Sequence, residues 1–332
     1  LYTSPISYLE AVWICATHPG RRETMRLSEA YSAFVPELAG QTPWELHAQG
    51  TSHEEQIEET AIMIVRSQRL VVFTGAGIST ESGIPDFRGP DGLWTKIDPE
   101  DFTYQRFVSD WEARKRLWQM HRGGGFPFGD VEPNRAHHAV AELERLGKLD
   151  CIITQNVDGL HQKAGNSDEK VLQLHGNMQW VKCLGCGARH PFAEVRAWLD
   201  GGVEVPECAA CGGILKPDAV FFGESMPFRE TTEAERRSVA CDLCIVIGST
   251  LTVYPAALMP QYAVRSGARL VIINDGATEL DHMADVRISA KAGEVMSQVL
   301  SRVKAKLATG AWLSSSSQPD GPVHHRVGNA WT

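Results

Sequence analysis

The chain has 332 residues, enough to bury a full hydrophobic core in one large domain or in two unequal ones. Its hydrophobic content of 43%, its charged content of 22% and the lack of an apolar run as long as a membrane span are typical of a soluble globular protein, so no membrane partner is predicted. A net charge of −9 argues against non-specific nucleic-acid binding, although it would suit a basic peptide.

Residues 1–53 are predicted to form a poorly ordered N-terminal extension. The apolar patch around Trp13 and Ile14 lacks the preceding basic region of a signal peptide. Translated sequence upstream of a start at Met25, the first methionine, is an equally open interpretation. We expect residues 308–332 to be a disordered tail, because from Ser314 onward they are rich in Ser, Pro and Gly and show no apolar period.

Between these ends, short apolar runs rich in β-branched residues alternate with helical patterns. The runs cover residues 70–74, 151–154, 243–247 and 270–273, and each one stops at small or polar residues. This alternation predicts a parallel α/β sheet, in which ligands bind beyond the carboxyl ends of the strands. Helices are expected over residues 134–146 and 293–307.

Two stretches interrupt the alternation. Residues 91–131 carry aromatic side chains among charges and end in Gly123, Gly124 and Gly125, which indicates a helical insertion on a flexible hinge. Residues 179–216 contain paired cysteines and no long helical pattern, which indicates a small module inserted into the sheet domain.

The small module contains two cysteine pairs, each with two residues between its members. The four cysteines are Cys183, Cys186, Cys208 and Cys211. Four thiolates at this spacing suit tetrahedral zinc, and the set lacks the histidine or carboxylate ligands of a hydrolytic site, so the Zn²⁺ should be structural. A redox or disulfide pair is the alternative, but it would need an oxidising compartment. We therefore expect an α/β fold: a Rossmann-like parallel sheet domain with an inserted zinc-ribbon module and a helical insertion.

The remaining cysteines give no second site. Cys241 and Cys244 repeat the two-residue spacing, but they lie at the entry to an apolar run and should be small buried hydrophobes. Cys15 and Cys151 have no partner that the sequence indicates.

A glycine-rich loop, residues 75–89, follows the first apolar run. It opens with Gly75, Ala76 and Gly77, whose backbone N–H groups could hold a pyrophosphate. Thr80 stands where the usual dinucleotide fingerprint has its third glycine, so an ordinary dehydrogenase is disfavoured.

This loop and several later motifs resemble the sirtuin family in order and spacing. The later motifs are Thr154-Gln155-Asn156-Val157-Asp158-Gly159-Leu160-His161, His175-Gly176, the two cysteine pairs, Lys216-Pro217-Asp218-Ala219-Val220-Phe221-Phe222-Gly223-Glu224, Gly248-Ser249-Thr250-Leu251, and Asn274. The resemblance covers residues 54–307. It implies an NAD-binding domain (54–178 and 217–307), a zinc module (179–216) and an acyl-lysine tunnel between them.

The resemblance also implies the activity: an NAD-dependent protein lysine deacylase that releases nicotinamide and, from an acetylated substrate, O-acetyl-ADP-ribose. NAD would be the co-substrate, Zn²⁺ would be structural, and the partners would be acyl-lysine proteins or peptides. His175 would be the general base that deprotonates a ribose hydroxyl, and Asn156 a second catalytic residue; an imidazole titrates near neutrality, as this task requires.

The cofactor-binding residues implied by the resemblance cluster after the strands and in the glycine loop. They are Gly75, Ala76, Gly77, Thr80, Asp86, Phe87, Arg88, Gln155, Asn156, Val157, Asp158, Gly248, Ser249, Thr250, Asn274, Asp275 and Ala292. The implied substrate-binding residues, between which a peptide would add as a strand, are Val220, Phe222, Gly223, Glu224 and Val253.

Simpler interpretations exist for individual residues. A lone histidine such as His175 is more often a structural hydrogen-bonder, Arg88 alone would be a surface arginine, and Asn156 and Asp158 could cap the next helix.

Acyl preference is indicated only by the helical insertion. Relatives that prefer acidic acyl groups carry a tyrosine and an arginine there, and the approximate counterparts here are Trp118 and His121. Neutral acyl groups, acetyl first, are therefore expected.

Two other functions compete with deacylation. A mono-ADP-ribosyltransferase would use the same cofactor but deliver ADP-ribose to a protein nucleophile. A non-catalytic zinc-ribbon interaction module would need clustered lysines and arginines, yet between Cys183 and Cys211 the sequence has only Arg189 and Arg196. Reliance on reduced cysteines and the missing signal segment favour the cytoplasm.

Overall fold

The computed structural model describes residues 51–310 except 88, 90–91, 96–97 and 123–130. All of the described residues fall within one unit, His47–Thr332. Several features predicted from the sequence therefore lie outside the described residues: positions 1–50 of the extension, including Cys15, the tail from residue 311 onward, Arg88 and the glycine hinge at 123–125.

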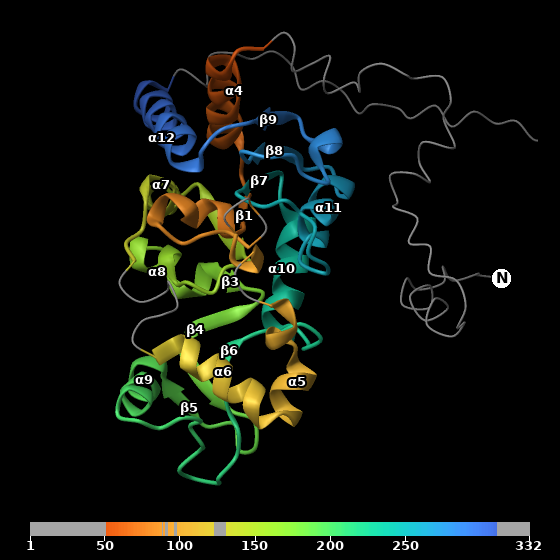
Figure 1. The fold of residues 1–332 in the computed structure, drawn as a ribbon. Coiled ribbons are helices and arrows are strands. Elements are labelled where there is room, and N and C mark those ends of the chain that lie inside the picture. Colours follow the sequence, from red (N-terminus) through yellow and green to blue (C-terminus); the bar gives the residue numbers. More distant parts are fainter. Residues whose placement is uncertain (1–50, 88, 90–91, 96–97, 123–130, 311–332) are drawn as a thin grey trace, which may run out of the picture. The chain divides into compact units, whose positions relative to one another are not determined.

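A six-stranded parallel sheet, in the order β3-β2-β1-β7-β8-β9, forms the centre of the unit (Figure 1). Its strands are β1 Leu70–Thr74, β2 Leu149–Thr154, β3 Val171–Gln173, β7 Leu243–Ile247, β8 Arg269–Ile273 and β9 Val286–Ile288. The four predicted strands are confirmed, although β2 begins two residues earlier than expected and β8 one residue earlier. The two edge strands, of three residues each, were not predicted.

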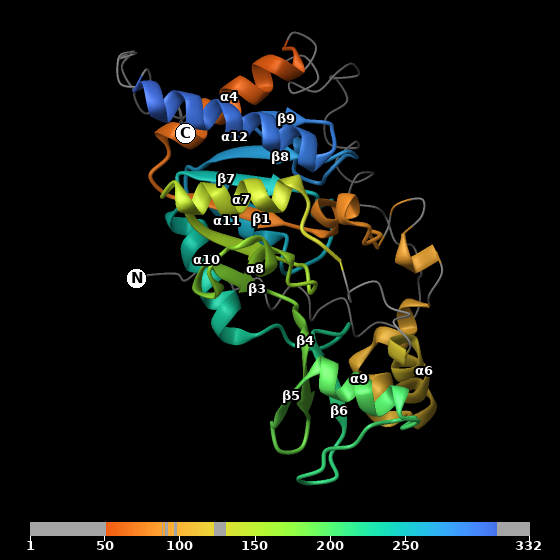
Figure 2. The ribbon, with the colours of Figure 1, turned by 90° about the vertical axis from the view of Figure 1, so that its left-hand side faces the viewer.

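Helices cover both faces of this sheet, as Figures 1 and 2 show. One face packs against α4 His53–Arg66, α7 Arg135–Arg145 and α12 Ala292–Thr309, and the other against α10 Phe228–Ala240 and α11 Leu258–Arg265. The short helix α8 (Leu160–Ala164) follows β2. The helices expected over 134–146 and 293–307 are thus confirmed as α7 and α12. None of the described helices is long and apolar enough to cross a membrane.

Strand alternation explains the two cores. In β1, Leu70 and Val72 belong to the core under α4, α7 and α12, whereas Val71 and Phe73 belong to the core under α10 and α11. Cys241 and Cys244 are buried in this second core, as predicted, and so is Cys151.

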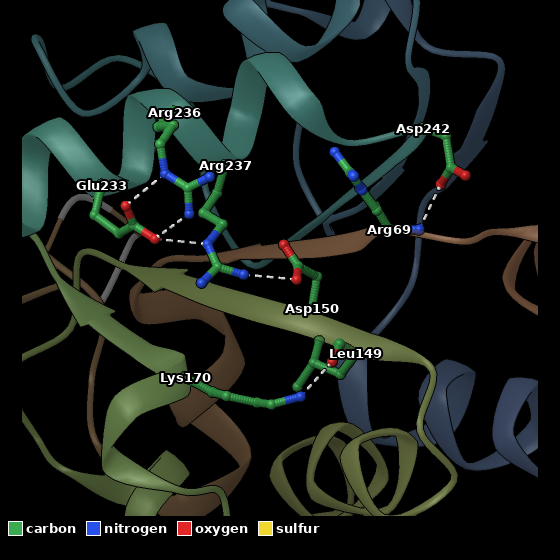
Figure 3. Close-up of polar contacts among 8 residues, drawn as sticks. All are labelled: Arg69, Leu149, Asp150, Lys170, Glu233, Arg236, Arg237 and Asp242. Atoms are coloured by element: carbon green, nitrogen blue, oxygen red, sulfur yellow. Dashed lines mark hydrogen bonds and ion pairs between the residues drawn. The ribbon is translucent and has the colours of Figure 1, made fainter.

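Ion pairs tie α10 to the amino-terminal end of β2 (Figure 3). Arg237 contacts Asp150 at 2.6 Å and Glu233 at 2.7 Å, and Arg236 contacts the same glutamate at 2.6 Å. Hydrogen bonds from Arg236 and Arg237 lower the pKa of Glu233 to about 2. Lys170 donates to the Leu149 carbonyl at 2.7 Å. This network lies at the opposite end of β2 from the polar residues that follow the strand, so we regard it as structural.

A second, three-stranded antiparallel sheet forms the small module, in the order β5-β4-β6. Its elements are β4 Gly176–Cys183, β5 Arg189–Pro191, α9 Phe192–Asp200 and β6 Leu215–Ala219. The helix α9, between the two cysteine pairs, was not predicted. Figure 2 shows β4 leading from the end of β3 into this module.

The helical insertion shares its core with the small module. Its main elements are the 3-10 helices η2 Leu93–Thr95 and η3 Pro99–Phe102 and the helices α5 Tyr104–Ser109 and α6 Trp111–His121. Phe107, Leu117 and Trp118 from these helices pack with Val181 of β4 and Leu199 of α9. The sequence grouped this insertion with the sheet domain, and its packing with the zinc module is a finding of the structure.

The histidines of α7 and α8 are packing or surface residues. His137 in α7 and His161 in α8 are buried with ring centroids 5.1 Å apart, and His138 is exposed. Burial lowers the pKa of His161 to about 4 and that of His137 to about 2, so both rings are neutral at neutral pH.

Candidate active site

The carboxyl ends of the parallel strands open onto a cavity of about 950 Å³. Thr74 pairs with Thr154 on one side and with Ile247 on the other, which brings the residues after these strands to one edge of the sheet. Every cofactor-binding and substrate-binding residue predicted from the sequence lines this cavity, except Arg88, which lies outside the described residues; His175 lines it as well.

Two loops meet backbone to backbone at the floor of the cavity. The Gly77 N–H donates to the Gly248 carbonyl at 2.8 Å, and a Cβ on Gly77 would lie 2.7 Å from the Gly248 Cα. The loop continues as the 3-10 helix η1 (Ala76–Ser82). Because a Cβ at Gly77 would clash with Gly248, glycine is needed at position 77 so that the two loops can approach each other.

Replacing Gly248 with alanine should prevent the two loops from approaching each other this closely. Gly248 has φ +64, and a Cβ would lie 2.2 Å from the Ile78 amide nitrogen, a backbone atom that cannot swing aside. We expect Gly248→Ala to lose at least about 2 kcal/mol of unfolding free energy and most NAD affinity. Denaturant unfolding and calorimetric titration measure both.

Gly147→Ala is the matched control for this substitution. Gly147 has φ +69, but a Cβ there would meet nothing within 4 Å. It should lose only the left-handed backbone penalty of about 1 kcal/mol and keep its NAD affinity. Equal losses in the two variants would show that the loop contact is unimportant.

Amide and hydroxyl groups after β2 hold these loops together. Gln155 Nε2 donates to Ser249 Oγ at 2.8 Å, and Asn156 Nδ2 donates to the Gly75 carbonyl at 3.1 Å and to Ser79 Oγ at 3.2 Å. The Ser79 hydroxyl in turn donates to Asp158 at 2.7 Å. Ser79 was not predicted as a site residue, although it lies within the glycine loop; only its partners reveal its place.

Asp158 contacts the start of α8 and also lines the cavity. One carboxylate oxygen accepts from the Leu160 N–H at 2.9 Å at the start of α8, and the other accepts from Ser79. Burial raises its pKa, and these hydrogen bonds oppose the rise. The carboxylate thus caps the helix while it lines the cavity.

His175 lies between β3 and β4, with its ring against the loop after β2. Its Nδ1 is 3.0 Å from the Gln155 carbonyl oxygen. Since a carbonyl only accepts, Nδ1 carries the proton in the neutral ring and Nε2 is left as the basic nitrogen. Burial lowers the pKa of His175, and the hydrogen bond to Gln155 opposes this, so the ring is mainly neutral at pH 7.

Aromatic rings form one wall of the cavity. Trp94 lies 5.2 Å from Phe87, 5.5 Å from Phe102 and 5.8 Å from Phe222 between ring centroids. Trp94, Phe102 and Leu117 were not predicted as lining residues, although the aromatic content of the insertion was the available signal. Such a wall keeps water away from reactive groups.

The predicted substrate segment, residues 220–224, is joined to both sides of the cavity. The Val220 N–H donates to the His175 carbonyl at 2.8 Å. Phe222 exchanges backbone hydrogen bonds with the insertion, from its N–H to Phe102 and from the Tyr104 N–H to its carbonyl, both at 2.9 Å. Its backbone is thus already paired, which the sequence did not indicate.

The four cysteines predicted to bind zinc converge. All four Sγ atoms lie within 4.8 Å of one another, with Cys183 and Cys211 3.5 Å apart and Cys186 and Cys208 3.7 Å apart. Tetrahedral Zn–S bonds of about 2.3 Å would place the sulfurs about 3.8 Å apart, so the cluster fits Zn²⁺. The Cys186 and Gly185 N–H groups donate to Cys183 Sγ and lower its pKa.

Comparisons with known proteins agree with this arrangement. The model of the Sir2 family matches residues 75–255. The NAD-dependent protein deacetylase of Thermodesulfovibrio yellowstonii is 45% identical over 255 residues, which are 77% of this chain and 98% of that protein. A solved Sir2 structure with a deacetylated p53 peptide and 3'-O-acetyl ADP-ribose is 39% identical, with a TM-score of 0.69, covering 74% of this chain and 97% of that one. A Sir2–p53 peptide–NAD⁺ structure is 36% identical, with a TM-score of 0.66, covering 77% and 98%.

The sheet, the cavity at its strand ends and the cysteine cluster define a dinucleotide-binding α/β protein with an inserted metal module. The chain belongs to the Sir2 family, as the resemblance to sirtuins predicted.

Proposed function

We propose that this protein is an NAD-dependent protein lysine deacetylase whose general base is His175. The observation that carries the proposal is the neutral imidazole held by the Gln155 carbonyl at a cavity that is bounded by the glycine loop and the substrate segment. Membership of the Sir2 family supports the reaction, the use of NAD and acyl-lysine substrates.

The cavity suits NAD in size and chemistry. Its volume lies in the range of cofactor sites, and glycine backbone at the strand ends allows a diphosphate to approach closely. NAD would supply the ribose carbon that takes the acyl oxygen when nicotinamide leaves. Asn156 and Asp158 would orient the nicotinamide half, Phe87 would exclude water, and His175 Nε2 would take the proton from a ribose hydroxyl.

The acyl end of the cavity should favour uncharged groups. His121 lines the cavity, whereas Trp118, the other residue considered, is buried in the small-module core. Burial, and then the charge of Arg196, lowers the pKa of His121 to about 4, so its ring is neutral at pH 7. Lys291 is the only lysine or arginine among the described residues that line the cavity, and it precedes α12 on the cofactor side.

We expect purified protein to deacetylate an acetyl-lysine peptide only when NAD is present. Nicotinamide and O-acetyl-ADP-ribose should form in equal amounts. A matched succinyl-lysine peptide should react at least about tenfold more slowly, because Lys291, the only lysine or arginine among the described residues that line the cavity, adjoins the predicted cofactor residue Ala292 and not His121. Mass spectrometry follows both peptides. Faster succinyl turnover would refute the preference, and ADP-ribose attached to protein would favour mono-ADP-ribosyl transfer instead.

Domain boundaries and location are also proposals. We propose that residues 54–178 and 217–307 form the NAD-binding part and residues 179–216 the zinc module. We propose the cytoplasm as the location, because a zinc site of four thiolates requires reduced cysteines.

A further inference from the structure

Lys216 is a charged side chain buried beneath the substrate segment. Its side chain is only 3% exposed, and its ammonium donates to the carbonyls of Pro217 and Ala219 and contacts Glu224 Oε2 at 2.9 Å. The ammonium also lies 4.1 Å from the Phe221 ring centroid. Burial lowers the pKa of Lys216, and Glu224 opposes this shift. Burying an ammonium is costly, and all four of these contacts fall within residues 217–224.

Glu224 also makes its polar contacts within residues 216–224. The carboxylate oxygen that contacts Lys216 accepts from the Phe221 N–H at 2.9 Å, and the Glu224 N–H donates to the Phe221 carbonyl at 3.0 Å. The ion pair therefore closes a turn and fixes both ends of the segment. Between those ends lies Val220, whose N–H is bonded to the His175 carbonyl.

We propose that the Lys216–Glu224 ion pair is a positioning device that holds residues 217–224 in the shape that an acyl-lysine peptide needs for binding beside His175. In this proposal Glu224, which lines the cavity as predicted, acts through Lys216 and the Phe221 amide. This inference deepens the proposed function and rests on it.

The test compares Lys216→Met, which keeps the length of the side chain but removes its charge, with Arg189→Gln. Arg189 of β5 pairs at 2.7 Å with Asp218, which lies on β6 as Lys216 does, but the Arg189 side chain is 48% exposed. Lys216→Met should weaken binding of a fluorescent acetyl-lysine peptide, and raise its KM, about tenfold. ADP-ribose affinity and kcat at saturating peptide should stay within about twofold of wild type. Arg189→Gln should change none of these values.

A second comparison separates positioning from stability. Glu224→Gln leaves a buried ammonium without its counter-charge, so it should lower Tm more than Lys216→Met does. Adding Lys216→Met to Glu224→Gln removes the unpaired charge and should bring Tm back toward wild type, while the peptide KM stays raised. If KM recovered together with Tm, or if folded Lys216→Met bound peptide as wild type does, the pair would be merely structural and the inference overturned.

Peptide binding is read by fluorescence polarisation without NAD, so it does not depend on turnover. If wild-type protein bound the acetylated peptide but released no nicotinamide, the proposed deacetylation would be refuted. The binding data for the variants would still decide the role of the ion pair.

Discussion

His175→Ala should lose deacetylation by about 10²- to 10⁴-fold in kcat/KM while it keeps its fold and its zinc. The substitution removes the imidazole whose Nδ1 is oriented by the Gln155 carbonyl, and no other described histidine except His121 lines the cavity. Steady-state kinetics with an acetyl-lysine peptide measure the loss, and NAD binding should change little because the glycine loop is intact.

His138→Ala is the matched control, since His138 is exposed on α7 and should be dispensable. Wild-type turnover in His175→Ala would show that another group is the base.

The acid side of the wild-type pH profile tests the same assignment. Burial lowers the pKa of His175 below the usual imidazole value of about 6.5, and the base is the neutral ring. Activity should therefore persist below pH 6.5 and be lost only as the pH falls through the lowered pKa. The residual activity of His175→Ala should lack this acid limb.

Loss of the metal should produce the second large effect. Structural zinc contributes about 10–16 kcal/mol of apparent binding free energy in small zinc domains, and this is folding free energy. Cys183 ends β4, whose first residue follows His175 directly, so a module without metal should also displace His175. We expect a strong chelator, or Cys186→Ser, to lower Tm markedly and to abolish deacetylation.

The control for the zinc prediction is Cys241→Ala, which alters a buried thiol in the sheet domain. It should keep one equivalent of zinc per chain, measured by elemental analysis, and most of its activity. Full activity in zinc-free Cys186→Ser protein would contradict a structural role for the metal.

The sequence predicted those parts of the fold that have a local signal. Runs such as Leu70–Thr74 are buried at every position and almost wholly apolar because both faces of the strand are covered, and they are followed by glycine or by polar residues. The edge strands β3 and β9 escaped prediction, since three residues carry too little pattern and pairing with a neighbouring strand defines them.

The site was predictable where its residues follow strands and unpredictable where it depends on contacts across the fold. The glycine loop and Gln155 to Asp158 could be placed because parallel strands share one edge. Ser79 and the Lys216–Glu224 pair could not, because their tasks arise from hydrogen bonds and ion pairs between particular atoms. The shared core of the insertion and the zinc module has the same origin: it joins residues up to about a hundred positions apart.

The close approach of Gly77 and Gly248 also limits how this protein could be redesigned. With no space for a Cβ at either position, a side chain cannot be added at Gly77 or Gly248 unless the backbone of the facing loop moves. The end of β8 offers more freedom: Asp275 is exposed and lines the cavity, and Asn274 beside it is half-buried. An engineer who wanted the enzyme to accept a cofactor with an additional phosphate on its adenosine ribose would therefore begin there, with an arginine.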